Sequence, residues 1–230
     1  NGVKSRQEED RNADGKPDAT YRFDAQERIL EERLDADFDG RFESISQYEA
    51  GDLTSRSLAT GADATPERQE FYADGKLSRV EVDEDHNQRT EVWNFYDAKG
   101  NLVRQNLDAD QDGRRDAWIE LDAKTGKATR TETDTSGDGK RDTWQVSSAK
   151  GVIQSQASDR NADGVADRTI FFSKGAAARY EQDDDFDGRI DARGTLDAEG
   201  EPRVAETDTT GDGLFDSRIT HEAGQKILEE

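Results

Sequence analysis

Cysteine and methionine are absent from this 230-residue chain, which also has only 3 prolines. Without cysteine there are neither disulfide bridges nor thiolate metal ligands. No apolar run approaches the roughly 20 residues that a helix needs to cross a bilayer, so we expect no transmembrane segment in this chain. No signal peptide is visible and the chain starts at Asn1, so we expect a processed or trimmed product.

Apolar and basic residues are also scarce. Hydrophobic residues make up 30% of the chain, and 54 acidic residues against 32 basic ones give a formal charge of −22. This charge repels phosphates, which argues against a nucleic-acid partner. So few apolar residues would favour disorder, but the acidic and apolar residues recur together at fixed spacing. A bound dication could supply the stability that a thin core lacks.

The acidic residues mark an internal repeat of 24 to 26 residues, the feature to seek before any other. We expect a single domain over residues 1–230 that consists of about nine repeats. The first positions of the nine acidic loops are Asp10, Asp35, Ala59, Asp83, Asp108, Asp134, Asp159, Asp183 and Asp208.

Each repeat predicts a β-hairpin. In the fourth repeat, a run rich in aromatic and β-branched residues at 90–96 is followed by Asp97-Ala98-Lys99-Gly100 and a second run at 101–107. Aspartate favours an Asx turn and glycine supplies a positive φ, which together are typical of a hairpin connection. The turns should therefore lie at one end of the strands and the acidic loops at the other.

Two columns of apolar residues, one in each predicted strand, support this assignment. A helix is not expected, because no segment keeps the 3.6-residue period of a helix. Position 14, counted from the start of each loop, is Phe23, Tyr48, Tyr72, Tyr96, Leu121, Ser147, Phe172, Leu196 and His221. The column in the second strand is Ile29, Leu53, Leu77, Leu102, Ala128, Ile153, Ala177, Pro202 and Ile227. We predict an all-β array of hairpins in a long antiparallel meander, twisted or superhelical. The alternative is a β-propeller whose four-stranded blades each use two repeats.

The loops have the composition of metal sites. In the fifth loop Asp108, Asp110 and Asp112 alternate, Gly113 permits a sharp bend, and Asp116 closes the loop at position 9. Hard oxygen ligands in a flexible turn suit calcium. An EF-hand would place a bidentate glutamate at position 12, whereas here the acid stands at position 9 in all nine loops.

This D-x-D-x-D-G-x-x-D pattern resembles the calcium loops of integrin-type FG-GAP and VCBS repeats. The resemblance implies calcium bound between strands, in those families within a β-propeller. The turn and its flanks, as in residues 95–102, are also similar to the YD repeats of Rhs-type surface and toxin-shell proteins.

We predict about six to eight calcium ions held by side chains at positions 1, 3, 5 and 9 and by the carbonyl at position 7. The third loop, with Ala59, Gly61, Asp63 and Glu67, has lost two ligands and should be empty, and Gln88 in place of glycine should weaken the fourth. The candidate ligands are Asp10, Asn12, Asp14, Lys16 and Asp18; Asp35, Asp37, Asp39, Arg41 and Glu43; Asp83, Asp85, Asn87 and Glu91; Asp108, Asp110, Asp112, Arg114 and Asp116; Asp134, Ser136, Asp138, Lys140 and Asp142; Asp159, Asn161, Asp163, Val165 and Asp167; Asp183, Asp185, Asp187, Arg189 and Asp191; and Asp208, Thr210, Asp212, Leu214 and Asp216.

Three tryptophans, Trp93, Trp118 and Trp144, share position 11 of successive repeats, opposite the position-14 column. At position 13 the same strip continues with Phe71, Phe95, Val146 and Phe171. The strip is either a second core or an exposed aromatic platform for a glycan or a protein.

The sequence indicates no enzyme. No nucleophile, P-loop or H-E-x-x-H motif is present, and neither of the two histidines, His86 and His221, stands in a catalytic pattern. We expect a calcium-rigidified structural or adhesive repeat of an exported or cell-surface bacterial protein, because calcium modules of modest affinity need extracellular calcium. The alternative is a module that binds a surface glycan or another protein through Trp93, Trp118 and Trp144.

Overall fold

The computed structural model describes residues 2–61, 65–222 and 225–229. In this part of the chain no helix is long and apolar enough to cross a membrane. The sequence predicts one array over residues 1–230, and the chain divides into two compact units, Asn1–Arg114 and Arg115–Glu230. The boundary falls inside the fifth acidic loop, and each unit is considered by itself.

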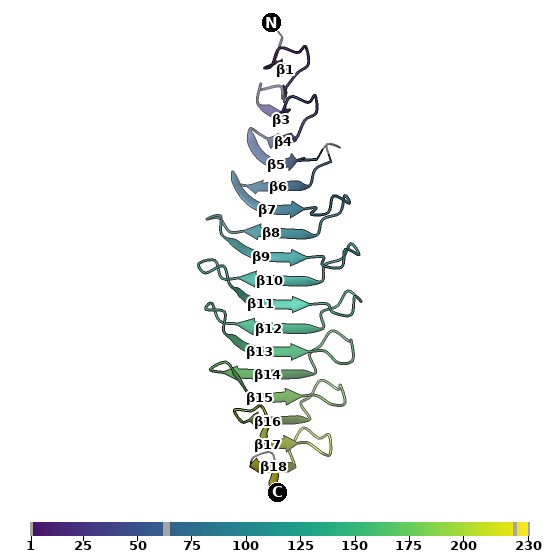
Figure 1. Ribbon diagram of the computed structural model, residues 1–230, viewed down its shortest axis with the longest axis vertical. Coiled ribbons are helices and arrows are strands. Elements are labelled where there is room, and N and C mark those ends of the chain that lie inside the picture. The colour runs from purple at the N-terminus through teal and green to yellow at the C-terminus, as the bar shows by residue number, and fades with distance from the viewer. Residues whose placement is uncertain (1, 62–64, 223–224, 230) are drawn as a thin grey trace. The chain divides into compact units, whose positions relative to one another are not determined.

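The first unit is an antiparallel meander in which every strand pairs with the next one in sequence (Figure 1). Its strands are β1 (Arg6–Glu9), β2 (Ala19–Phe23), β3 (Ile29–Leu34), β4 (Ser44–Glu49), β5 (Asp52–Leu58), β6 (Arg68–Ala73), β7 (Lys76–Val82), β8 (Val92–Tyr96) and β9 (Leu102–Leu107).

The second unit repeats the same plan with ten strands. They are β10 (Ala117–Leu121), β11 (Ala128–Thr133), β12 (Thr143–Ser147), β13 (Ile153–Ser158), β14 (Arg168–Ser173), β15 (Ala176–Gln182), β16 (Ala192–Leu196), β17 (Pro202–Thr207), β18 (Ser217–Glu222) and β19 (Gln225–Glu229). The all-β hairpin meander is therefore confirmed. Neither unit breaks into the four-stranded blades that the propeller alternative requires.

In all hairpins but the last, the two apolar columns meet as cross-strand pairs. Phe23 lies opposite Ile29, Tyr48 opposite Leu53, and the pairing recurs in the hairpins that follow. A β-bulge precedes each pair, where the register shifts between positions 13 and 14. The column partner in the last hairpin is Lys226, next to the expected Ile227. Such pairs add on the order of 0.2–1 kcal/mol each.

The hairpin turns follow the expected chemistry. Asp97 Oδ1 accepts the N–H groups of Lys99 at 2.8 Å and Asn101 at 3.0 Å. The side-chain amide of Asn101, which also donates to Asp97, and these two backbone bonds lower the pKa of Asp97. Gly100 takes a φ of 85°, a conformation that costs a residue without a Cβ little. Asp24, Asp122 and Asp197 accept N–H groups in the same way in three other hairpins, whereas Ser148 takes this place in the sixth.

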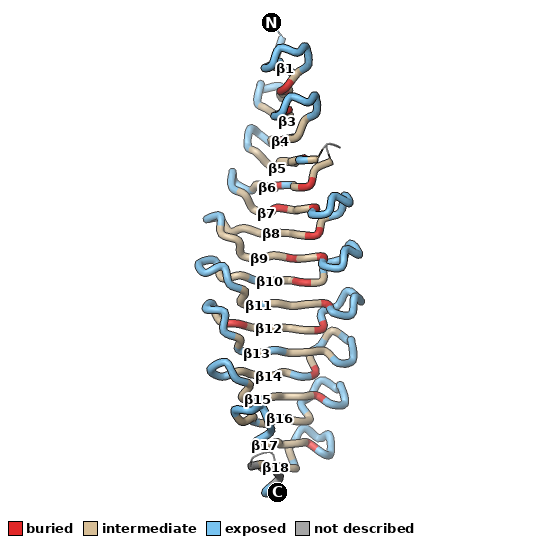
Figure 2. Tube along the Cα trace, viewed as in Figure 1, coloured by how far each residue is buried: buried red, intermediate tan, exposed pale blue. Residues whose placement is uncertain are grey.

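Each unit is a single layer, because every strand contacts only the strands that precede and follow it. As a result, the buried residues are mostly polar. The buried hydrophobic residues of the described chain are Ala19, Ala59, Val80 and Ala117, whereas 13 aspartates and glutamates are buried. The buried segments gather where the strands run into the acidic loops (Figure 2). The chain therefore hides carboxylates where most proteins hide apolar side chains.

Candidate metal-binding loops

The first residue of each loop organises the turn. One oxygen of its carboxylate accepts the N–H of position 6 at 2.6–2.9 Å in eight loops. In seven of these the donor is glycine; in the fourth loop it is Gln88, which adopts a φ of 70°. Gln88 therefore takes the backbone conformation of the glycine that the sequence pattern lacks there. The third loop has Ala59 at this position and no such bond.

Positions 3, 5 and 7 form a chain of Asx turns. The position-5 side chain accepts the N–H of position 7 at 2.7–2.9 Å in eight loops. Position 3 accepts the N–H of position 5 in the same way, for example Asp37 from Asp39 at 3.2 Å. These bonds use one oxygen of each side chain and point successive side chains toward the inside of the turn.

The acid at position 9 closes the loop. One of its oxygens accepts the N–H of position 2 at 2.5–3.1 Å in eight loops. In five of these, position 3 donates to the same carboxylate. Position 9 therefore needs a hydrogen-bond acceptor: in these five loops a side chain without one would leave two N–H groups unpaired.

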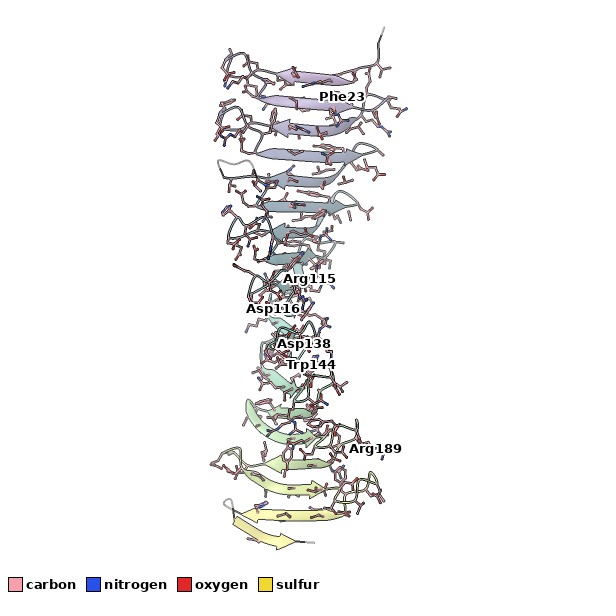
Figure 3. All side chains as sticks on the ribbon, turned by 90° about the vertical axis from the view of Figure 1, so that its right-hand side faces the viewer. Phe23, Arg115, Asp116, Asp138, Trp144 and Arg189 are labelled. Atoms are coloured by element: carbon pink, nitrogen blue, oxygen red, sulfur yellow. The ribbon has the colours of Figure 1, made fainter. Side chains whose placement is uncertain are left out.

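Several loops bring their carboxylates close enough to hold a metal ion. Within the two units, acidic oxygens lie within 4.8 Å of one another in four loops. These groups are Asp35, Asp37, Asp39 and Glu43; Asp83, Asp85 and Glu91; Asp134, Asp138 and Asp142; and Asp183, Asp185 and Asp191. Figure 3 labels Asp138 of the sixth loop and Trp144 of the strand that follows it.

The other loops differ from these four. Asn12, Asn161 and Thr210 occupy position 3 of the first, seventh and ninth loops, and the described residues form no three-acid group of this closeness there. The fifth loop is divided by the unit boundary. Its first half, with Asp108, Asp110 and Asp112, keeps the turn bonds of the other loops. Asp63 of the third loop lies outside the described residues.

Burial separates the loop positions into two classes. Eleven of the 13 buried acids stand at position 1 or 9, and only Glu67 among these eleven has an ion-pair partner in the described residues. The other two buried acids, Glu31 and Glu70, lie on strands, and each pairs with an arginine, Arg33 at 2.8 Å and Arg68 at 2.9 Å. The buried acids on strands therefore have arginine partners, whereas the buried acids of the loops, except Glu67, have no ion-pair partner in the described residues.

Buried acids of successive loops are also neighbours across the strands. The N–H of position 1 donates to the carbonyl of position 9 in the preceding loop, as from Asp35 to Asp18 and from Asp183 to Asp167 at 2.7–2.8 Å. Like charges placed directly opposite each other destabilise a strand pair. Each unit thus carries a row of carboxylates along one end of its strands.

The pKa of Asp185 shows repulsion among the acids of a single loop. The N–H of Asp187 favours the charged form, but loss of water and the charges of Asp187, Asp191 and Asp183 raise the pKa above its ordinary value. In the sixth loop, burial opposes the charge of Asp142, whereas hydrogen bonds from Thr135 and Ser136 lower its pKa. A loop with hydroxyl donors therefore tolerates its charge better than a loop with four aspartates.

Cationic side chains link neighbouring loops. Lys140 Nζ donates to the carbonyl of Ala162 in the next loop at 2.8 Å and lies against Gly164. Arg89 reaches the carbonyl of Gln111 in the same way at 3.4 Å. Gly164, at position 6, leaves room for the Lys140 side chain. Lys140 is a candidate ligand through its backbone carbonyl, and its side chain makes this second contact.

The aromatic strip lies on a sheet face that no second layer covers. Trp118 and Trp144 flank Glu132 on the intervening strand. Arg141 stacks on the Trp118 ring, with its Cζ 4.3 Å from the ring centre, and pairs with Glu132. The tryptophans, Trp93 included, are half-buried among their neighbours within the sheet. Related stacks join Arg79 to Phe71 and Arg179 to Phe171.

Comparison with known proteins gives no family. No family model matches the chain, and no curated protein matches it. Solved structures with partial similarity include a Staphylococcus aureus TarM mutant in complex with Fondaparinux, alpha-GlcNAc-glycerol and UDP, at 11% identity and a TM-score of 0.30 over 61% of this chain and 21% of that one. A porin-like protein from Bacteroides uniformis matches at 10% identity and a TM-score of 0.22, over 92% of this chain and 85% of that one. This chain spans about a fifth of the length of TarM, and these likenesses are too low to carry an argument about function.

Proposed function

We propose that this chain is a calcium-binding structural repeat protein whose ions stabilise each unit from the loop ends of its strands. The observation that carries the proposal is the contrast between the two kinds of buried acid. Strand acids are paired with arginine, whereas ten buried loop acids have no protein cation within the described residues. Buried carboxylates without a counter-charge are strongly destabilising.

Calcium suits these loops better than other divalent ions. The ligands are carboxylate, amide and hydroxyl oxygens in flexible turns, and calcium accepts six to eight such oxygens at 2.3–2.6 Å. Thiolate sites are excluded because the chain has no cysteine, and no histidine belongs to the acid groups. Eight dications would bring the formal charge from −22 to about −6, which would reduce the repulsion along each row.

The energy at stake is comparable with the stability of a domain. A site with a Kd near 10⁻⁴ M adds roughly 1.4 kcal/mol at millimolar calcium. Seven independent sites would add on the order of 10 kcal/mol, within the usual range for a whole domain. Because cytosolic calcium would not fill such sites, the proposal includes export to the cell surface or the medium, with a non-catalytic scaffold or adhesive role.

Calcium withdrawal tests the proposal directly. Thermal melting followed by circular dichroism should show a large drop in the midpoint when calcium is replaced by EDTA, and native mass spectrometry should count six to eight bound ions. Magnesium at the same concentration is the control and should restore little of the loss. Identical melting curves in calcium and in EDTA would refute the proposal.

A second candidate function is recognition of a glycan or protein by the tryptophan face. The supporting observation is that the half-buried Trp118 and Trp144 lie on a face without a covering layer. Glycan-array binding that is lost in Trp118→Ala, while the calcium-dependent melting curve is unchanged, would support this role. Calcium-dependent stiffness without any ligand would favour the scaffold alone.

A further inference from the structure

A groove of about 510 Å³ crosses four neighbouring strands of the second unit, β11 to β14 (Figure 1). Most of its lining belongs to two rows of cross-strand neighbours, which run from Thr131 to Ile170 and from Thr133 to Arg168. Residues directly opposite each other, and residues i and i+2 of one strand, share a face of an antiparallel sheet. Both rows therefore lie on one face, whereas the Trp144 side chain shares a hollow with Glu132 on the other.

The two rows are rich in groups that both donate and accept hydrogen bonds. Between their ends lie Gln145 and Gln156 in the first row, and Thr143 and Ser158 in the second. Gln156 Nε2 donates to Gln145 Oε1 at 3.0 Å, which leaves the second N–H and the Oε1 of Gln156 for a ligand. None of the described residues that line the groove is acidic, although the chain has 54 acidic residues. The groove is thus an uncharged, hydroxyl-rich surface with one cation.

That cation, Arg168, has no ion-pair partner among the described residues. The corresponding residue of the first unit, Arg68 at position 10 of the third repeat, pairs with Glu70 at 2.9 Å. Ile170 stands in the place of this glutamate in the second unit. A guanidinium presents its N–H donors in a planar fork that matches a carboxylate. The groove therefore ends in an arginine whose fork is available to an anion.

The same comparison explains why the surface is hollowed in the second unit. In the first unit, the row that leads to Arg68 contains Leu34 and Leu58. Thr133 and Ser158 take these places in the second unit, and both have smaller side chains. Smaller side chains with hydroxyl groups and an arginine without a partner therefore occur together, which favours a ligand site over a variation in packing.

We propose that this groove binds a carbohydrate that carries a carboxylate, such as a short oligosaccharide of uronic acids. Arg168 holds the carboxylate, the hydroxyl and amide groups of the two rows bond to sugar hydroxyls, and Ile170 packs against ring C–H groups. The volume is within the range of about 300–1,000 Å³ for small-ligand sites. An extended peptide fits less well, because it adds to the free edge of a sheet, whereas both edges of β12 and β13 are paired. The net charge of the chain opposes an anion only over about 8 Å at physiological ionic strength.

A glycan array tests the proposal on the whole chain in calcium-containing buffer. The array carries short oligosaccharides of galacturonate, mannuronate and glucuronate beside their neutral counterparts. At least one uronate oligosaccharide should bind, and its neutral counterpart should bind about tenfold more weakly or less, because it lacks the charged hydrogen bonds to Arg168. The inference depends neither on the calcium proposal nor on the tryptophan face, which lies on the other side of the sheet.

Two substitutions should remove this preference, measured by calorimetry with the oligosaccharide that binds. Arg168→Gln deletes the cation, and Ile170→Glu gives it the partner that Arg68 has in the first unit. Each should weaken binding of the uronate by about tenfold or more. The matched control is Arg130→Gln, which removes the same charge from β11 on the opposite face, where Arg130 pairs with Glu132. The control should bind as the unaltered chain does.

Thermal melting shows whether each variant is folded, and Arg168→Gln decides the question if Ile170→Glu does not fold. The site is overturned if no uronate oligosaccharide binds, if the neutral counterparts bind equally well, or if Arg168→Gln binds like the unaltered chain. An equal loss in Arg130→Gln also overturns it, because the attraction would then be general to positive charge. Native mass spectrometry should count as many calcium ions in Arg168→Gln as in the unaltered chain, so the groove and the calcium loops are tested separately.

Discussion

The third and eighth loops have the same backbone closure but different electrostatics. In both, the acid at position 9 accepts N–H groups from positions 2 and 3: Glu67 at 2.6 and 2.8 Å, and Asp191 at 2.6 and 3.0 Å. The third loop has lost its first carboxylate, and His86 of the next loop lies 3.2 Å from Glu67. The eighth loop keeps Asp183, Asp185 and Asp191 within 4.8 Å of one another, without a protein cation on any of the three in the described residues.

The pKa directions of the two loops follow from this difference. Burial opposes the charge of Glu67, but the N–H groups of Thr60 and Gly61 and the nearby His86 outweigh it and lower the pKa. The pKa of Asp185 is raised by the acids around it. The hydrogen-bonded turn is thus common to both loops, and only the complete loop carries a charge that an ion must neutralise.

The largest expected effect comes from breaking the closure of the third loop. Glu67→Ala leaves the N–H groups of Thr60 and Gly61 without an acceptor. Two hydrogen bonds to a charged group contribute about 1.5–3 kcal/mol each, and because water can replace the acceptor at the exposed Thr60, the expected loss is about 2–4 kcal/mol. Urea denaturation should give the same loss in calcium and in EDTA. The matched variant Asp191→Ala should lose more in calcium than in EDTA. A calcium-dependent loss in Glu67→Ala would mean that the third loop binds an ion after all.

Much of this arrangement can be read from the sequence. The spacing of the acidic residues places the loops, and the two apolar columns mark the two strands of each hairpin, as Tyr48 and Leu53 do. Both follow from local periodicity, which a sequence displays directly. The bulge before each column pair is not predictable in this way, because it depends on how the turn returns the second strand.

Contacts between loops are the part that the sequence does not show. The pairing of His86 with Glu67 and the reach of Lys140 to Ala162 depend on which residues of different repeats become neighbours. The sequence marked Gln88 as a defect, yet it takes the glycine conformation, and its loop holds one of the close acid groups. Residue type alone therefore does not show the backbone conformation of this loop, and the weaker binding expected from Gln88 stays a prediction.

The second largest effect is expected when one charge is removed from the eighth loop. Asp185→Asn keeps an acceptor for the N–H of Asp187, which Asp185 binds at 3.1 Å, but removes a ligand charge. In calcium it should cost up to about 1.4 kcal/mol, the contribution of one site with a Kd near 10⁻⁴ M at millimolar calcium. In EDTA it should stabilise the chain, because like charges no longer meet. Urea denaturation in calcium and in EDTA measures the change in the free energy of unfolding, which should be negative in calcium and positive in EDTA. A lower stability of Asp185→Asn in EDTA would contradict the prediction.

A third, smaller effect is expected when the lost acids of the third loop are restored. Ala59→Asp combined with Gly61→Asp restores the acids at positions 1 and 3, and native mass spectrometry in calcium should then count one more ion. The gain in stability should stay below about 1.4 kcal/mol, because the carboxylate introduced at position 1 of this loop would face Glu43 across the strands. Gly61→Asp alone is the control and should add no ion. A double variant without an extra ion would show that the four carboxylates of the rebuilt loop, those introduced at positions 59 and 61 together with Asp63 and Glu67, are not sufficient.

The smallest effect is a pH dependence of opposite sign in the two loops, measured in calcium-free buffer. A lowered pKa means that charged Glu67 stabilises the fold above its ordinary pKa and that this stability is lost as the pH falls through the lowered value. A raised pKa means that charged Asp185 destabilises the fold near neutral pH, and protonation relieves this as the pH falls through the raised value. The advantage of Asp185→Asn over the unaltered chain should therefore disappear on mild acidification. The disadvantage of Glu67→Gln should persist to lower pH before it shrinks. Urea midpoints of each variant and of the unaltered chain, measured across the acidic pH range, give both differences. If the two differences change with pH in the same way, the two loops do not have the opposite electrostatics inferred from their charges.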